Sequence, residues 1–304
     1  MYNQKRFYWL KSWAMGSSFR KASRVATCPE PENVSNISRP RQHKIGEGSF
    51  SNIWFTKGDD VVTKIAKLSE PRSIEFLKAE VAALGRLRHK CIVRLIDYPS
   101  AMIIVLERIA GPSCRAYSRK WAVDPFAGWH IMGKLSSALV HLKEREILHR
   151  DIKPDNVMLR VTPHSIDPVL IDFGFAVSVC ELSSTNCRRG TPGYAAPEVF
   201  LDGRPCYASD LFSLGVTCYE VTSRGYLFWN QTEISTLLYM VDVFRQPLEF
   251  PEVEVGTFRR VLESTVVLDS CKRISAEVVS AIYRKWTERR IRPTVVGRGR
   301  MDMV

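Results

Sequence analysis

The residues between 43 and 107 follow a hydrophobic pattern that predicts short strands. Two runs rich in β-branched and aromatic residues, SNIWFT at 51–56 and VVTKIA at 61–66, flank the tetrapeptide KGDD. Glycine and aspartate fit a tight turn, so this arrangement predicts a β-hairpin. A further apolar run, AMIIVLE, occupies 101–107. We therefore expect this part of the chain to be rich in strands.

A helical pattern interrupts these strands at 72–87. Ile74, Leu77, Val81 and Leu84 recur at the three- and four-residue spacing of one helix face. Glu80 lies one turn before Leu84, so it is expected on nearly the same inward face. A buried carboxylate needs a cation nearby, because an unpaired charge is costly to remove from water.

After residue 107 the pattern is mainly helical. Ile131, Leu135, Leu139 and Leu142 form one apolar stripe. The segment 209–221, SDLFSLGVTCYEV, is apolar almost all round and predicts a helix that is buried on every side. A chain of 304 residues is long enough for a large core. The pattern thus indicates an α+β fold, with a small β-rich lobe that contains one helix, followed by a larger α-helical lobe.

Basic residues are concentrated at both ends of the chain. The 44 Lys and Arg outnumber the 32 Asp and Glu, which gives a formal net charge of +12. Such a charge favours an anionic partner, or serves solubility alone. Segment 1–41 carries no acid before Glu30, and 289–304 is a second basic segment. We expect segment 1–41 to be a disordered tail, a transit peptide or a segment that docks on a membrane surface or a partner. Both basic segments are expected to contact anionic membranes or nucleic acid weakly.

The eight cysteines show no C-x-x-C pair and no zinc-ligand spacing, which favours scattered thiols in a reducing compartment. No apolar run reaches the roughly 18 to 20 residues of a membrane span. The N-terminus also lacks the apolar core of a secretory signal. We therefore expect an intracellular protein, in the cytoplasm or the nucleus.

The stretch HKIGEGSF at 43–50 contains two closely spaced glycines, Gly46 and Gly48. Glycines between two strands let backbone N–H groups approach phosphate oxygens without a Cβ in the way. The same pattern also suits an ordinary hairpin turn. Residues further along the chain are needed to decide between a phosphate-binding loop and a plain turn.

Five further features occur downstream in a fixed order. They are Lys64 on a predicted strand, Glu80 on a predicted helix, HRDIKPDN at 149–156, DFG at 172–174 and APE at 196–198. With these motifs the chain resembles eukaryotic-type protein kinases, in the serine/threonine branch. The resemblance implies a bilobal kinase domain over 42–288, with an N-lobe at 42–107 and a C-lobe at 108–288.

The resemblance also implies an ATP site. Lys64 would bind the α- and β-phosphates and pair with Glu80, which supplies the cation that the buried carboxylate requires. Three apolar side chains would enclose adenine, Leu106 would stand at the gate of that pocket, and Glu107 and Ile109 would offer backbone groups to the base. The implied ATP-binding residues are Ile45, Gly46, Gly48, Ser49, Ile53, Val62, Lys64, Glu80, Leu106, Glu107, Ile109 and Met158.

For the chemistry, the resemblance implies Asp151 as the residue that accepts or orients the substrate hydroxyl's proton, and Lys153 as a contact of the transferred phosphate. Asn156 and Asp172 would hold Mg²⁺ through oxygen ligands. Thr191 would help arrange Asp151 and Lys153. The residues with implied structural roles are Leu84, Leu95, His149 and Phe173 in an apolar spine, Asp210 as the residue on which that spine stands, and Glu198 with Arg273 in a buried ion pair.

Two positions depart from the family pattern. Ser51 replaces the third glycine of the loop, and Cys187 stands where an acceptor hydroxyl of the activation loop is usual, with Ser183, Ser184 and Thr185 upstream. Such departures indicate a divergent member, of which a virus-encoded kinase is one example. We expect a non-specific serine/threonine protein kinase that depends on ATP and Mg²⁺. The alternatives are a pseudokinase scaffold and a small-molecule kinase of the same fold.

Overall fold

The computed structural model describes residues 42–56, 60–161, 165–182, 188–223 and 256–291. The predicted N-terminal tail, the hairpin turn at 57–59, the activation-loop positions 183–187 and the last residues from 292 lie outside these ranges. The predicted tail contacts and the domain boundary at 288 stay predictions. Helix α9 continues to Ile291.

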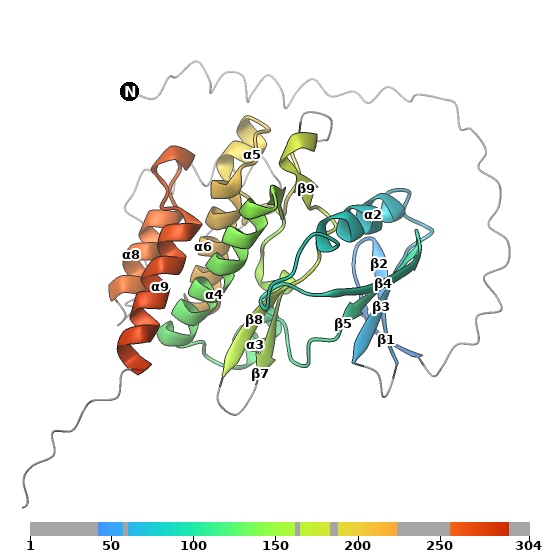
Figure 1. Cartoon of the computed structure of the whole chain (residues 1–304), viewed down its shortest axis with the longest axis horizontal. Helices are drawn as coiled ribbons and strands as arrows, with labels where there is room; N and C mark the ends of the chain where they lie inside the picture. The colour runs from blue at the N-terminus through green and yellow to red at the C-terminus, as the bar shows by residue number, and fades with distance from the viewer. Residues whose placement is uncertain (1–41, 57–59, 162–164, 183–187, 224–255, 292–304) are drawn as a thin grey trace, which may run out of the picture. The chain divides into compact units, whose positions relative to one another are not determined.

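The N-terminal part of the described chain, residues 42–107, contains a five-stranded antiparallel sheet (Figure 1). Its spatial order is β1-β2-β3-β5-β4, and the bounds are β1 Gln42–Glu47, β2 Ser51–Thr56, β3 Val61–Ala66, β4 Leu95–Ser100 and β5 Ile103–Glu107. Strands β2 and β3 coincide with the two runs predicted from alternation, and their antiparallel pairing confirms the hairpin.

The strand register places the nucleotide-site candidates on one face of this sheet. Lys64 pairs with Ile53 on one side and with Ile104 on the other. Val62, two residues earlier on β3, pairs with Leu106. Because directly paired residues and alternate residues along a strand share a face, these five side chains lie on the same side of the sheet.

Helix α2 (Ser73–Leu84) confirms the predicted helix and packs close to β3, β4 and β5. Its buried side chains are Ser73, Phe76, Leu77, Glu80, Ala83 and Leu84. Ile74 and Val81, which the pattern placed on the inward stripe, are only partly buried. The buried stripe is centred on Phe76 and Glu80 instead. A prediction from the spacing of apolar residues does not count Glu80, which is polar but points inward, so it places the centre of the stripe too far to one side.

The larger part that follows is mainly helical, as predicted, with α3 Cys114–Lys120, α4 Pro125–Glu144, α5 Pro197–Leu201, α6 Tyr207–Ser223, α8 Gly256–Thr265 and α9 Ala276–Ile291. Asp124 caps α4, since its carboxylate accepts from the N–H groups of Phe126 and Ala127. Two small sheets pair β6 (Ile147–Leu148) with β9 (Val177–Ser178), and β7 (Val157–Val161) with β8 (Ile166–Leu170).

Helix α4 is central to this helical part and packs against α6 and α9 (Figure 1). Its predicted stripe is confirmed, since Ile131, Leu135, Leu139 and Leu142 are all buried. Gly133 permits the close approach of α9, because a Cβ at this position would lie 2.0 Å from the ring of Tyr283. Helix α6 is buried along most of its length, as its all-round apolar pattern predicts.

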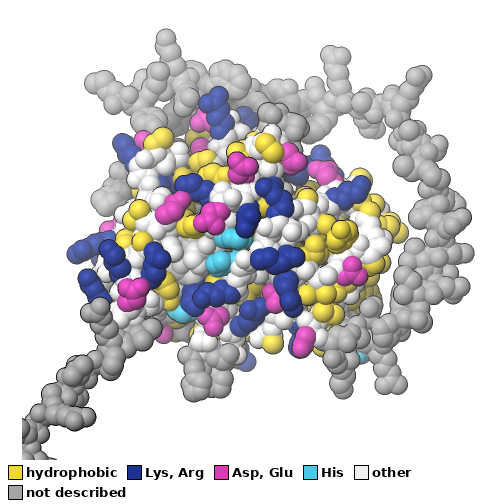
Figure 2. Space-filling view, in the orientation of Figure 1, with side chains coloured by type: hydrophobic (Ala, Val, Ile, Leu, Met, Phe, Trp, Pro, Cys, Tyr) yellow, Lys and Arg dark blue, Asp and Glu magenta, His cyan; other side chains and the backbone are white. Residues whose placement is uncertain are grey.

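Basic side chains are scattered over the surface. Figure 2 shows Lys and Arg across much of the face turned to the reader, with fewer Asp and Glu among them. Within the described residues, none of the helices is both long enough and apolar enough to cross a membrane.

Candidate functional site

Lys64 joins the sheet to the rest of the candidate site. Its ammonium donates to Glu80 Oε2 and to Asp172 Oδ1, at 2.7 Å each. Burial alone would lower the pKa of Lys64, but the charges of Asp172 and Glu80 outweigh burial and raise it. Asp172, although partly buried, keeps a lowered pKa because of Lys64. The buried carboxylate of Glu80 thus has the cation that the sequence required of it.

Asp151 is held by hydrogen bonds at both carboxylate oxygens. Oδ1 accepts from Thr191 Oγ1 at 2.5 Å, and Oδ2 accepts from Lys153 Nζ and from Asn156 Nδ2, each at 2.9 Å. Lys153 also donates to Thr191 Oγ1 at 2.7 Å. The loop 149–156 and the segment that carries Thr191 are therefore tied together around one carboxylate.

The base of this loop rests on helix α6. Asp210 accepts from the backbone N–H groups of His149 and Arg150, at 2.8 and 2.9 Å. His149 is fully buried, and burial lowers its pKa. Its Nδ1 accepts from the N–H of Asp151 at 3.2 Å, so a neutral ring carries its proton on Nε2, 3.2 Å from the carbonyl oxygen of Ile171. The ring lies edge-on to Phe173, with centroids 4.6 Å apart. These contacts favour a packed core histidine.

Two residues of this region have left-handed backbone conformations. Arg150 has φ 67° and Asp172 has φ 62°. Such angles are costly for residues with a Cβ and are found where the surrounding structure fixes them. Asp210 supplies that constraint for Arg150, and Lys64 holds the side chain of Asp172.

The glycine-containing loop lies between β1 and β2, and Gly48 N–H donates to the carbonyl of Ser51 at 2.8 Å. A Cβ at Gly46 or Gly48 would meet its nearest protein atoms at 3.6 Å, an ordinary contact. Neither glycine has a positive φ. The packing of the described residues therefore does not require glycine at these positions, whereas a ligand that approaches the backbone would.

The other nucleotide-site candidates are unequally exposed. Leu106 and Ile109 are buried, while Ile53, Val62 and Met158 are partly buried, and Val62 and Met158 pack at the edge of the core. Glu107 is fixed by its side chain, which accepts from Arg160 and from the N–H of Arg94. Ser49 is exposed at the loop bend, and Ile45, in a β-bulge of β1, is 56% exposed.

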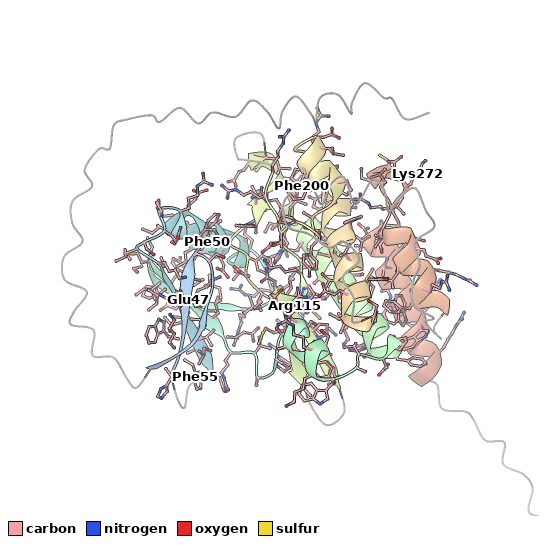
Figure 3. The ribbon with its side chains drawn as sticks, turned by 180° about the vertical axis from the view of Figure 1, so that it is seen from behind. Glu47, Phe50, Phe55, Arg115, Phe200 and Lys272 are labelled. Carbon is pink, nitrogen blue, oxygen red and sulfur yellow. The ribbon has the colours of Figure 1, made fainter. Side chains whose placement is uncertain are left out.

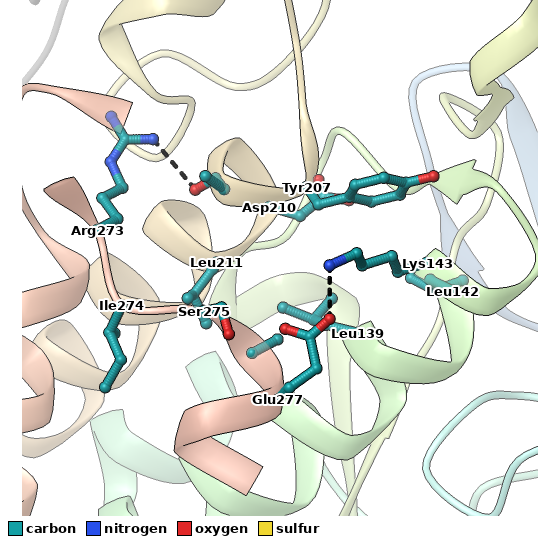
Figure 4. A pocket seen from close by; sticks show the side chains of 12 residues that line it. Leu139, Leu142, Lys143, Tyr207, Asp210, Leu211, Arg273, Ile274, Ser275 and Glu277 are labelled. Carbon is teal, nitrogen blue, oxygen red and sulfur yellow. Dashed lines mark hydrogen bonds and ion pairs between the residues drawn. The ribbon is translucent and has the colours of Figure 1, made fainter. Parts of the chain in front are cut away.

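Glu198 and Arg273 form a paired contact in the helical part. Arg273 Nη1 and Nη2 donate to the two carboxylate oxygens of Glu198 at 2.6 and 2.8 Å. Arg273 also lines a small pocket between α4, α6 and α9, across which Lys143 and Glu277 make a second ion pair (Figure 4). Asp210, which holds the base of the loop 149–156, also lines this pocket, whereas Thr191, Lys153 and Asn156, which contact Asp151, do not.

Comparison with known proteins identifies the family. A sequence model described as the protein kinase domain matches residues 40–286. The chain belongs to the protein kinase family. Its five-stranded sheet and helical part are the two lobes of a kinase, which confirms the predicted fold class.

This kinase is similar to several curated serine/threonine-protein kinases. It is 32% identical to serine/threonine-protein kinase ATG1c of Arabidopsis thaliana over 206 residues, which cover 64% of this chain and 28% of that protein. It is 34% identical to serine/threonine-protein kinase D2 of Homo sapiens over 202 residues, which cover 63% of this chain and 23% of that protein. The kinase thus spans less than a third of the length of either relative.

An aromatic cluster in this kinase was not expected from its sequence. Phe50 of the glycine-containing loop lies 4.0 Å from Phe76 of α2 and 6.1 Å from Phe175, measured between ring centroids (Figure 3). Arg189 lies over the ring of Phe76 and pairs with Glu75 at 3.0 Å. Helix α2 therefore contacts both the loop and the segment before Thr191.

A second unexpected group surrounds Arg115 on helix α3. Its guanidinium contacts Asp155, Tyr194 and Glu220. We refer to these four residues as the Arg115 cluster. The only hint in the sequence is that Asp155 and Glu220 are acids near motif residues. Arg115, which joins them, is 40 residues away from Asp155 and 105 residues away from Glu220 along the chain.

Proposed function

We propose that this kinase transfers the γ-phosphoryl group of ATP to serine and threonine hydroxyls of proteins, with Mg²⁺ as the metal. The observation that carries the proposal is the ammonium of Lys64, which contacts Glu80 and Asp172 at 2.7 Å each. Because Lys64 contacts both α2 and the DFG segment, the arrangement supports the interpretation that these two elements are positioned for nucleotide binding.

The residues fit ATP with a divalent metal. The amide nitrogen of Asn156 donates to Asp151, which leaves its oxygen as a ligand, and the Asp172 side chain is 45% exposed. An amide oxygen and a carboxylate are the ligand types that Mg²⁺ prefers. When bound, the metal would neutralise developing phosphate charge. Ile53 and Val62 on one side and Met158 on the other would enclose adenine, and Gly46 and Gly48 would leave room for phosphates.

The protein groups around Asp151 define what the chain itself does in the reaction. The substrate oxygen forms a bond to the γ-phosphorus while the bond to the bridging oxygen of ADP breaks, and the hydroxyl proton passes to Asp151. Thr191, Lys153 and Asn156 hold that carboxylate in one orientation. Lys153 places an ammonium beside the transferred group. The Lys153–Thr191 contact supports the serine/threonine assignment.

Two features support further parts of the proposal. The similar proteins are named as serine/threonine-protein kinases, which supports protein substrates. The six described cysteines are free, and Cys91, Cys114 and Cys218 are buried, which supports an intracellular site of action.

The test is transfer of labelled phosphate from ATP to a generic protein panel, followed by mapping of the modified residues. The Asp172→Asn variant keeps the shape of the side chain but removes its charge, so transfer should fall by at least about 100-fold. Asp124→Asn is the matched control, because asparagine also caps a helix well and Asp124 lies at α4. Its activity should equal that of the unmodified chain.

Two other outcomes would replace the proposal. Tight binding of ATP with Mg²⁺ but no transfer would favour a pseudokinase, for which Ser51 is the main sequence support. Transfer to small alcohols but not to proteins would favour a small-molecule kinase. Modification of tyrosine alone would contradict the serine/threonine assignment.

A further inference from the structure

The guanidinium of Arg115 is held by every member of its cluster. Nε and Nη2 donate to Asp155 Oδ2 at 3.1 and 2.9 Å, Nη2 donates to the Tyr194 hydroxyl at 2.6 Å, and Nη1 donates to Glu220. The Tyr194 hydroxyl in turn donates to Glu220. The Arg115 side chain, labelled in Figure 3, is only 13% exposed. One planar cation therefore bridges two carboxylates and a phenol.

The cluster lies directly beside the reacting groups. Asp155 belongs to the loop 149–156, between Lys153 and Asn156, which both contact Asp151. Tyr194 comes three residues after Thr191, whose hydroxyl donates to Asp151. Any protein segment that presents a hydroxyl to Asp151 must pass close to these two stretches. The cluster is therefore placed to contact residues that neighbour the acceptor.

The charge of the Arg115 cluster determines which substrate residues can lie next to the acceptor. Without Arg115, Asp155 and Glu220 would present two carboxylates, one about half exposed and one buried, and these would bind a lysine or arginine of a substrate. Arg115 donates to both acids and to the phenol between them. Burial raises the pKa of Glu220 even with Arg115 next to it, so a buried carboxylate here depends on this cation.

We propose that Arg115 is a specificity-determining residue that takes the place of a substrate cation, so that this kinase does not select basic residues next to the acceptor. The proposal rests on the proposed function as a protein kinase. It assigns neutral or acidic sequences around Ser or Thr as the substrate class. It also predicts that removal of Arg115 creates a preference for basic substrates.

The first experiment is a peptide library in which each of the positions flanking a Ser or Thr is varied in turn. For the unmodified kinase, replacement of Ala by Arg at any of the five positions before the acceptor should change kcat/KM by less than about threefold. For Arg115→Gln, Arg should become favoured by about tenfold or more at one of these positions. Arg115→Gln combined with Asp155→Asn should lose that preference.

Arg115→Lys is the matched control, because it keeps the positive charge at the same place. Its selectivity should remain close to that of the unmodified kinase. A tenfold preference of the unmodified kinase for Arg before the acceptor would overturn the proposal, and this outcome needs no variant to fold. Unchanged selectivity in Arg115→Gln would overturn it as well.

A second experiment does not depend on catalysis. Ethylguanidinium should raise the melting temperature of Arg115→Ala more than that of the unmodified chain, because it can bind between the vacated acids. The double variant Arg115→Ala with Asp155→Asn should lose most of this gain. Equal shifts in all three proteins would overturn the proposal. If the kinase transfers no phosphate but the guanidinium effect is present, the proposed function and the specificity role of Arg115 both fail, and only a cation site between the two acids remains.

Discussion

Ser51 replaces a glycine of the family pattern, and its surroundings explain why the loop tolerates the change. It is the first residue of β2, pairs with Ala66 and is only 3% exposed. Its backbone is not among the left-handed positions of the described chain. A side chain at this position is therefore compatible with the loop, and glycine is not needed for conformational reasons.

We expect Ser51→Gly to affect stability more than nucleotide binding. Glycine inside a strand lowers the free energy of unfolding by about 0.5 to 1 kcal/mol. The KM for ATP should change by less than about threefold, since the Ser51 side chain is buried in the protein. Urea unfolding and ATP titration of initial rates measure the two effects. A tenfold gain in apparent ATP affinity would mean that Ser51 obstructs the phosphates.

At the scale of elements, the connection between α2 and β4 is fixed to helix α4 by two histidines. The rings of His89 and His141 stack with centroids 5.6 Å apart. His89 Nδ1 accepts from the N–H of Cys91 at 3.1 Å, and His141 Nε2 accepts from the N–H of Arg88 at 3.2 Å. The acceptor nitrogen of His89 must be unprotonated, so its place in this junction between the lobes requires a neutral His89 ring.

This junction predicts a loss of stability in mild acid. Burial, followed by the charges of His141 and Lys90, lowers the pKa of His89 to about 4. The unfolded chain binds a proton near pH 6.5 and the folded chain only near pH 4, so stability falls as pH drops through this window. The slope from His89 should stay below about 1.4 kcal/mol per pH unit, because a single ring binds at most one additional proton.

Urea unfolding between pH 7 and 4 measures this slope, with His89→Asn as the comparison. The asparagine oxygen can still accept from Cys91 but does not titrate. The slope should be shallower in His89→Asn than in the unmodified chain, although His130 and His149, whose pKa values are also lowered by burial, still contribute. Identical slopes would show that the histidine junction does not govern acid stability.

At the scale of the whole molecule, the ion pair between Glu198 and Arg273 connects distant parts of the helical lobe. Arg273 also donates to the carbonyls of Val267 and Ala208, and its side chain is fully buried. Glu198 accepts in addition from Ser209 Oγ at 2.6 Å. One guanidinium thus joins α5, the start of α6 and the chain before α9.

Glu198→Gln should destabilise the whole domain, because it leaves the charge of Arg273 buried without its partner. Such a loss costs about 3 to 5 kcal/mol, and the melting temperature should fall by roughly 6 to 20 °C. Glu277→Gln is the matched control, since Glu277 makes an ion pair of 2.6 Å with Lys143 in the same region but is well exposed. It should cost less than about 1 kcal/mol, and equal losses for both variants would contradict the argument.

The sequence predicts local features of this kinase better than it predicts contacts between distant residues. Strands 51–56 and 61–66 were recognisable because their pattern and turn residues are local. Glu80 was recognised as needing a cation because an inward carboxylate on an apolar helix face has few alternatives. The partners of Arg115 were not predictable, since nothing in the pattern of α3 points to an acid 105 residues away. The ring of Phe50 was likewise not expected near Phe76, because loop side chains follow no periodicity.

The left-handed residues also bear on how this chain can be improved by engineering or by evolution. A left-handed backbone costs a residue with a Cβ about 1 to 2 kcal/mol, and Glu146, Arg150 and Asp172 all adopt it. Glu146 is exposed and is not one of the candidate site residues, so replacement by glycine should raise stability with little effect on activity. Glycine at 150 or 172 would relieve similar strain but would remove the contact of Arg150 with the Phe175 carbonyl or the contact of Asp172 with Lys64. Selection for stability and selection for activity thus agree at the first position and conflict at the other two.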